Sequence, residues 1–350
     1  MLDRDKIERY LKPLFDILSD YQYKTISLQA KALKNALDLK RIDVNELNKF
    51  RSKILVLAKQ TNNKIAVQYS KLFNDMVKFD IYNQMVVYNR GYEKGIIKSK
   101  PQVPSSISFV MRNEYVKEYA FMSATINRTA QYGGNKLAVI MQDSINQALS
   151  GIPTDRIAID SARQIAEEGI SITYTSGRQV NDLVAYTRQN LITSITQNNM
   201  SMQLDLFNSI DAEDKYYETS SHFGARPTHA IWQGRIFKSW TEFVNATGYG
   251  EVDGLGGVNC RHTFYPFIPE VSTKAFDRYN AKENREQYEN MQQQRYLESQ
   301  VRKWKTRELS SENLGVVDEQ SKMKIRTYQA KLRDLTSSEN LTRQYSREQI

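Results

Sequence analysis

The chain has 350 residues, of which 25% are charged and 40% hydrophobic, and its formal net charge is +9. This composition is typical of a folded protein and excludes both a disordered chain and a membrane-embedded one. The charged N-terminus excludes a signal peptide, and the apolar runs are too short to span a bilayer, so we expect the protein to be made and kept in a cytoplasm.

Residues 1–100 are predicted to form a helical N-terminal region. Apolar residues recur there at helical spacing in four stretches, at residues 7–18, 28–37, 47–57 and 65–92. Asp43, followed by Glu46 three residues later, has the spacing of a helix N-cap. We therefore expect several short helices that pack on one another or on a partner.

A second region, residues 101–212, is predicted to be helical with one short strand. A linker at residues 98–106, which contains two prolines, precedes a helix that Gly133-Gly134 is expected to interrupt or kink. Alternating apolar and polar residues predict a strand at residues 170–174, followed by a turn at Ser176-Gly177. Further helices are expected at residues 155–169 and 180–202, and an irregular acidic stretch at 205–214.

A central region, residues 213–270, contains all three histidines, the only cysteine and two of the three tryptophans. Short strands are predicted at residues 216–221, 231–237 and 263–267. Residues 271–350 are predicted to form polar, basic helices at 279–304 and 322–335, with a loosely structured end at 337–350. The sequence thus predicts an α+β, predominantly helical fold. Helical N-terminal and C-terminal regions would flank a small, irregular, glycine-rich central domain that contains β-strands.

Three interpretations of the central region are open, and metal binding is the first. His222, His229, Cys260 and His262 offer three imidazoles and a thiolate, which are the ligand types of a tetrahedral zinc site. Their spacing matches no zinc motif, because Cys260 and His262 are separated by a single residue. The residue types would suit zinc, but their spacing does not match a zinc motif. We therefore expect no cofactor, with zinc as the alternative.

The second interpretation is nucleophilic catalysis, and the third is a structural role. Cys260 follows a glycine-rich turn that could stabilise an oxyanion, but no cysteine-hydrolase signature surrounds it, so we expect no enzymatic activity. We favour the structural role, in which buried histidines and arginines hydrogen-bond loop carbonyls and carboxylates. The expected polar cluster consists of His222, Arg226, His229, Trp232, Gln233, Asp253, Asn259, Cys260, Arg261 and His262.

Four motifs of the central region occur as a set: His222-Phe-Gly-Ala-Arg-Pro-Thr-His229, Trp232-Gln-Gly, Gly248-Tyr-Gly250 and Asp253-Gly-Leu-Gly-Gly-Val-Asn-Cys-Arg-His262. The set resembles the phage minor capsid protein 2 family, and the resemblance extends over about residues 130–335. The chain is more distantly similar to Mu-type head morphogenesis proteins, in which a second cysteine often stands at the position of His262. Histidine, like cysteine, is a residue type that can bind a metal ion, so a possible metal ligand is retained at that position.

The resemblance implies a minor capsid protein of a tailed phage, located in the phage head near the portal vertex. Its expected partners are the portal protein and the major capsid protein, with assembly taking place in the host bacterial cytoplasm. Residues 1–100 would dock on the portal or the capsid, and the protein would assist head assembly and DNA packaging or ejection. Relatives fused to toxin domains leave an alternative, a Cys/His-based or metal-dependent enzyme carried in the virion.

Positive charge is concentrated in residues 1–100 and 271–350, whereas residues 101–270 are slightly acidic. Basic ends of this kind suit contact with packaged double-stranded DNA, because Lys and Arg neutralise phosphates without reading bases. A solvated, lysine-rich helix surface would have the same composition. DNA is therefore a candidate partner and not a required one.

Overall fold

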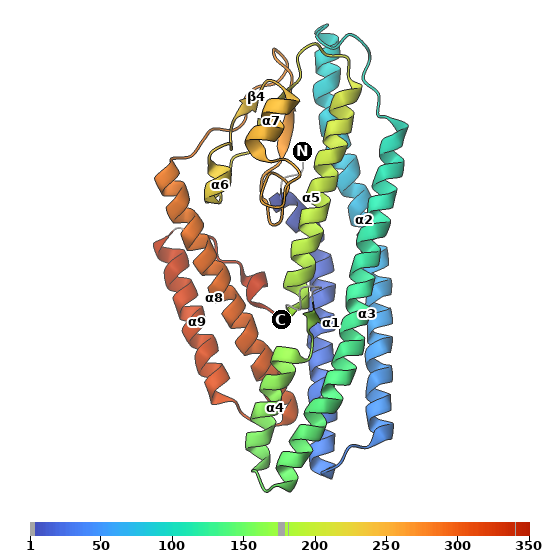
Figure 1. The fold of residues 1–350 in the computed structure, drawn as a ribbon, viewed down its shortest axis with the longest axis vertical. Helices are drawn as coiled ribbons and strands as arrows, with labels where there is room; N and C mark the ends of the chain where they lie inside the picture. Colours follow the sequence, from blue (N-terminus) through green and yellow to red (C-terminus); the bar gives the residue numbers. More distant parts are fainter. Residues whose placement is uncertain (1–3, 174–178, 181, 340) are drawn as a thin grey trace. The chain divides into compact units, whose positions relative to one another are not determined.

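A computed structural model describes residues 4–173, 179–180, 182–339 and 341–350. α-Helices dominate it (Figure 1), and a small three-stranded sheet is the largest sheet of the described residues. The predicted fold class, α+β and predominantly helical, is therefore confirmed. The chain forms two compact units, each assembled from three separate segments. The first unit comprises Met1–Pro13, Val67–Tyr119 and Arg188–Glu289, and the second comprises Leu14–Ala66, Ala120–Thr187 and Asn290–Ile350.

Long helices make up most of the chain, and several of them contribute residues to both units. They are α1 (Arg4–Leu39), α2 (Val44–Glu93), α3 (Ser105–Leu149), α4 (Thr154–Glu168), α5 (Leu183–Ser209), α8 (Ala281–Leu314) and α9 (Glu319–Ser338). Among the described helices, none combines the length and the hydropathy that a bilayer crossing requires. Residues 94–104 separate α2 from α3, so the predicted break in the helical pattern at 98–106 overlaps a connection between two helices, and this connection lies within one segment of the first unit.

The prediction of several short N-terminal helices is wrong, because α1 and α2 are each continuous. Polar residues interrupt the buried stripe of α1 and hid its continuity in the sequence. Gln22 and Gln29 are at most 3% exposed, and both are hydrogen-bonded. The Gln29 side chain, for example, donates to the main-chain oxygen of Gly169 at 2.7 Å. The predicted N-cap of α2 is confirmed, since Asp43 Oδ1 accepts the Asn45 main-chain N–H at 2.8 Å.

The glycine pair Gly133-Gly134 lies within the continuous helix α3 and does not interrupt it. Instead, Gly133 permits a close approach in the second unit. A Cβ atom at Gly133 would lie 2.8 Å from the main-chain oxygen of Gly169 and 2.8 Å from Gln29 Nε2. At Gly134 a Cβ atom would meet only Arg51 Cγ, at an ordinary 3.5 Å. The two adjacent glycines therefore differ in their surroundings.

This difference predicts opposite effects of the same substitution. Gly133→Ala should lower the free energy of unfolding by about 2 kcal/mol, because the methyl group displaces packed main-chain atoms. Gly134→Ala should raise it by about 0.5–1 kcal/mol, because alanine loses less backbone entropy in a helix. Urea unfolding of both variants at one pH measures the two changes. Equal effects of the same sign would contradict the close approach at Gly133.

The second unit also contains the C-terminal helices and a small hairpin. β1 (Ile172–Thr173) pairs antiparallel with β2 (Gln179–Val180). The strand β1 lies within the strand predicted at residues 170–174. Tyr174 and the predicted turn at Ser176-Gly177 lie outside the described residues. Helices α8 and α9 run side by side (Figure 1). The end at 337–350, predicted to be loose, contains a 3-10 helix (Tyr345–Glu348), and Arg343 binds the buried Glu348 carboxylate through two hydrogen bonds of 2.7 Å.

The sheet of the first unit has the order β4-β3-β5, and both pairings are antiparallel. Its strands are β3 (Tyr216–Thr219), β4 (Ile236–Phe237) and β5 (Phe264–Phe267), and two short helices accompany them, α6 (Pro227–Ala230) and α7 (Trp240–Thr247). Two predicted strands are confirmed with shorter bounds. The strand predicted at 231–237 is limited to its last two residues, because the turn that follows α6 passes through Gly234, whose φ is 65°. The stretch at 205–214, predicted to be irregular, begins as the end of α5.

An aromatic cluster packs against one face of this sheet. Tyr217 of β3 lies with its ring centroid 5.3 Å from that of Phe243, and Phe264 of β5 lies 5.2 Å from Phe243. Both phenylalanine side chains are fully buried. The cluster comprises Tyr217, Phe237, Trp240, Phe243, Tyr249 and Phe264. It is the apolar support from which the loops of the candidate site extend.

Candidate functional site

A glycine-rich loop, residues 248–262, delivers Cys260 and His262. It leaves α7 at Gly248, which has the left-handed conformation (φ 60°) that ends many helices. The loop then folds back on itself, with the Leu255 N–H donating to the Thr247 carbonyl at 2.9 Å. Gly254 must lack a side chain, because a Cβ atom there would collide with the main-chain oxygen of Gly248. These glycines therefore form a compact loop that places Cys260 in the interior.

The short helix α6 delivers His229 from the opposite side. It begins at Pro227, whose missing N–H costs nothing at a helix start. The preceding loop is fixed by Asn284, a buried residue of α8. Asn284 Oδ1 accepts the N–H groups of Gly224 and Ala225, each at 3.0 Å, and its Nδ2 donates to the Ala225 carbonyl at 2.8 Å. This side chain thus holds the loop that leads into α6.

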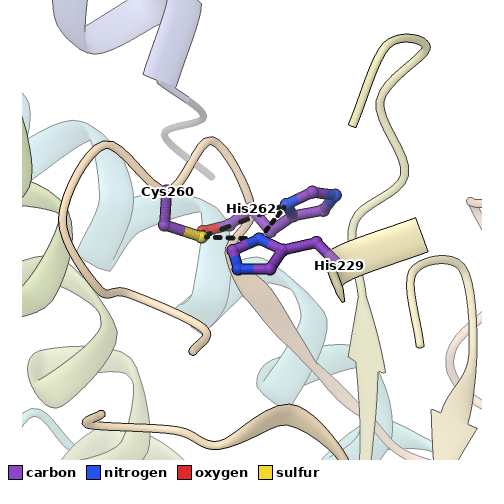
Figure 2. A group of neighbouring side chains, drawn as sticks. All are labelled: His229, Cys260 and His262. Atoms are coloured by element: carbon purple, nitrogen blue, oxygen red, sulfur yellow. Dashed lines mark hydrogen bonds between the residues drawn. The ribbon is translucent and has the colours of Figure 1, made fainter. Parts of the chain in front are cut away.

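His229, Cys260 and His262 form a His/Cys cluster in which the three side chains point toward one another (Figure 2). Each of the three residues is at most 3% exposed. Cys260 Sγ lies 3.6 Å from His229 Nδ1 and 4.0 Å from His262 Nδ1, and the two Nδ1 atoms are 3.4 Å apart. These are the residues of the described chain whose ligand atoms, within 4.8 Å of one another, could hold a metal ion.

Burial lowers the pKa of His229 and lowers that of His262 well below its ordinary value, so burial favours the neutral form of both rings. Electrostatic repulsion by the neighbouring His222 and His229 lowers the pKa of His262 further, and the positive charges of Arg261 and Arg226 add to this effect. Trp232 covers the rings, with its centroid 4.8 Å from that of each of the two histidines. The cluster therefore brings two imidazole nitrogens and one sulfur atom close together in the interior of the unit.

The residues predicted to form one polar cluster divide into a core and a periphery. Gln233 belongs to the core, because its Oε1 lies 3.1 Å from His262 Nε2 and accepts the His222 N–H at 2.9 Å. The His222 ring lies at the edge, half-buried, with Nε2 3.1 Å from Ser220 Oγ. Asp253 contributes its main-chain oxygen, 2.7 Å from His229 Nε2, while its own side chain is exposed.

The remaining members of the predicted cluster shape the surrounding loops. Arg226 donates to the Val258 carbonyl at 2.9 Å and so ties the start of α6 to the glycine-rich loop. Asn259 has a left-handed backbone (φ 57°), and its N–H donates to Thr193 Oγ1 at 3.4 Å. Arg261 is half-buried between the cysteine and the histidine that precede and follow it.

Sequence reasoning missed a second polar site in the helices of the first unit. Glu118 of α3 is 4% exposed, and its Oε1 accepts hydrogen bonds from Ser194 at 2.7 Å and from Asn198 at 2.8 Å. Tyr69 of α2 donates to the other carboxylate oxygen. Burial raises the pKa of Glu118 to about 7, more than these hydrogen bonds lower it. No local sequence motif indicates this site, because the residues that hydrogen-bond Glu118 lie on other helices, far from it in the sequence.

The comparison with known proteins agrees with the motifs of the glycine-rich loop and α6. A family model described as phage minor capsid protein 2 matches residues 15–337. The chain belongs to the phage minor capsid protein 2 family. This confirms the predicted resemblance and extends it beyond residues 130–335 toward the N-terminus. No solved structure matches the chain.

Two curated relatives of this member of the phage minor capsid protein 2 family are both named structural protein. One, from Lactococcus phage LL-H, is 27% identical over 303 residues, which is 80% of this chain and 81% of the relative. The other, from Lactococcus phage mv4, is 42% identical over 106 residues, which is 29% of this chain and 86% of the relative. The similarity to the first relative therefore involves most of both chains.

Proposed function

We propose that this chain is a minor structural protein of a phage head, located near the portal vertex and acting in head assembly. The observation that carries the proposal is the family match over residues 15–337, which includes most of both compact units. The relatives named as structural proteins support the same role. DNA packaging or ejection is the stage at which a protein in this position would act after assembly.

The helices of residues 1–100 are the proposed docking region for the portal protein, with the major capsid protein as the second partner. Large apolar side chains are exposed along α2, including Val67 (76% exposed) and Tyr82 (68% exposed). Exposed apolar residues on a long helix favour contact with another protein, because burying them removes apolar surface from water. We also propose that the four sequence regions have separate roles. Residues 1–100 would dock on the partner, residues 213–270 would hold the candidate site, and residues 101–212 and 271–350 would form the helical scaffold.

Packaged double-stranded DNA is the proposed third contact. The positive charge of residues 1–100 and 271–350 supports binding to phosphates without base recognition. Such binding should weaken steeply as salt rises, because each neutralised phosphate releases a counterion. Titration of the purified chain with double-stranded DNA at several salt concentrations measures this slope. Binding that is absent at low salt would remove DNA from the partners.

A structural role of the His/Cys cluster fits better than catalysis. A cysteine nucleophile must be reachable by its substrate, and Cys260 is only 3% exposed. The enzyme alternative, a hydrolase or toxin-like activity carried in the virion, would also need a base beside an accessible thiol. We therefore propose that the central region is a rigid module and not an active site.

Virion composition tests the proposed role. Purified virions and DNA-free proheads should both contain the chain, at a copy number well below that of the major capsid protein. Chemical cross-linking of the proheads should join residues 1–100 to the portal protein. Proheads assembled without the portal protein provide the control, and they should lack the chain. A virion fraction that contains no copy of the chain would contradict the proposal.

A further inference from the structure

The hydrogen bonds around the His/Cys cluster fix which nitrogen of each ring carries a proton. His229 Nε2 lies 2.7 Å from the main-chain oxygen of Asp253, which can only accept, so this nitrogen is the donor. His262 Nε2 lies 3.1 Å from Gln233 Oε1, an atom that also accepts the His222 N–H at 2.9 Å. That second bond fixes the orientation of the amide, so His262 Nε2 must donate as well. With Nε2 as the donor, the neutral form of each ring, which is also the form that binds a metal, has its lone pair on Nδ1.

The two Nδ1 lone pairs face each other across 3.4 Å, with Cys260 Sγ 3.6 and 4.0 Å away. Two acceptors at this distance cannot hydrogen-bond each other. One thiol proton can serve one of the two nitrogens but not both. The Cys260 thiol also lies 3.7 Å from the main-chain oxygen of His262, a further acceptor for the same proton. A single cation between the three atoms would satisfy all of them.

The distances match the edges of a tetrahedral zinc site. Zinc binds nitrogen at about 2.0–2.1 Å and thiolate sulfur at about 2.3 Å, so tetrahedral geometry places two nitrogens about 3.3 Å apart and nitrogen and sulfur about 3.6 Å apart. The observed separations are 3.4 Å between the Nδ1 atoms and 3.6 Å from His229 Nδ1 to Cys260 Sγ. The third, from Cys260 Sγ to His262 Nδ1, is 4.0 Å and exceeds the tetrahedral edge by a few tenths of an ångström.

We propose that His229 Nδ1, Cys260 Sγ and His262 Nδ1 bind one zinc ion. The surroundings support this assignment, because each ligating histidine of a metal site ordinarily donates its other N–H to a carbonyl or carboxylate oxygen. Here the Asp253 carbonyl and the Gln233 amide oxygen play that part. A thiolate with two imidazoles suits zinc and not magnesium or calcium, which take oxygen ligands.

The zinc ion would join two elements that have little regular structure of their own. His229 belongs to α6, a helix of only four residues, whereas Cys260 and His262 belong to the end of the glycine-rich loop. Metal binding would therefore hold α6 to this loop and to the start of β5. His222 lies outside the ligand set, because its Nε2 is engaged 3.1 Å from Ser220 Oγ.

Metal analysis of the intact chain tests the site. The chain is exposed to excess zinc, desalted and analysed for metal, and we expect about one zinc ion per chain. Replacement of zinc by cobalt should give the intense sulfur-to-cobalt absorption of a thiolate ligand. These two measurements need no variant. A chain that retains no zinc after desalting, or a cobalt spectrum without the thiolate band, would overturn the proposal.

Variants identify the ligands. Cys260→Ser, His229→Ala and His262→Ala should each reduce the zinc content from about one ion per chain to near zero. His222→Ala is the matched control, because it removes a neighbouring imidazole and should leave the zinc content unchanged. Circular dichroism confirms that each variant keeps its helices. Equal loss of zinc in His222→Ala would overturn the three-ligand assignment.

Discussion

Phe264→Ala is expected to lower the free energy of unfolding by about 4 kcal/mol, the usual cost of removing a buried phenylalanine side chain. Phe264 is fully buried in β5, and its ring lies 5.2 Å from Phe243 and 6.0 Å from Tyr217 by centroid distance. The surrounding rings are too rigid to collapse into the cavity, so the lost contacts are not recovered. Urea unfolding followed by tryptophan fluorescence measures the change.

Phe223→Ala provides the control for this prediction. Phe223 lies in the same unit, but its side chain is 40% exposed. Its removal should change the free energy of unfolding by less than about 1 kcal/mol. Because β5 begins two residues after His262, Phe264→Ala should also loosen the His/Cys cluster, whereas Phe223→Ala should not. Comparable losses of stability in the two variants would show that the aromatic cluster is not the core of this unit.

Glu118→Gln should abolish a pH dependence of stability that the wild-type chain shows between about pH 4.5 and pH 7. In the folded chain burial raises the pKa of Glu118 from its ordinary 4.5 to about 7, so folding favours the protonated form. The stabilising contribution of protonated Glu118 to the free energy of unfolding is therefore fully present below pH 4.5 and is lost as the pH rises through 7. A shift of this size corresponds to about 3 kcal/mol. Glutamine keeps the shape of the neutral acid and cannot ionise.

Unfolding at pH 5 and at pH 8 tests this prediction. Other groups titrate in both proteins, so the informative quantity is the difference between wild type and variant at the two pH values. The variant should be the more stable protein at pH 8, where the wild type must keep a buried carboxylate ionised or protonate it. Glu114→Gln, a change in the same helix at a side chain paired with Lys117 at the surface, is the control. Identical pH profiles for wild type and Glu118→Gln would contradict the raised pKa.

The sequence predicted which segments are helical better than it predicted where helices end. Apolar periodicity located the residues of α1 and α2, but buried polar residues interrupted the pattern, such as Gln22 and Gln29 in α1 and Asn62 in α2. The two glutamine side chains are buried because they hydrogen-bond main-chain groups more than a hundred residues away. The predicted interruption of α3 at Gly133 was wrong for a similar reason. Its lack of a side chain serves a contact with residue 169, which local sequence does not reveal.

The candidate site could be predicted in its residue types but not in its full membership. Glycine spacing and the rare histidines and cysteine marked the central region, and the structure brings His229, Cys260 and His262 together there. The contact of Asn284 with the loop before α6 could not be predicted, because Asn284 lies about 60 residues from that loop, within a helix rich in polar residues. Glu118 escaped notice for the same reason, since its partners are 49 to 80 residues away.

The interleaved segments of the two compact units determine when each can be completed during translation. The first unit requires residues up to Glu289, and the second requires residues up to Ile350, so neither is finished when the first hundred residues leave the ribosome. Domains that are contiguous in sequence usually fold one after another as they emerge. Here the early helices must wait with part of their apolar surface exposed until the later segments of each unit have been synthesised.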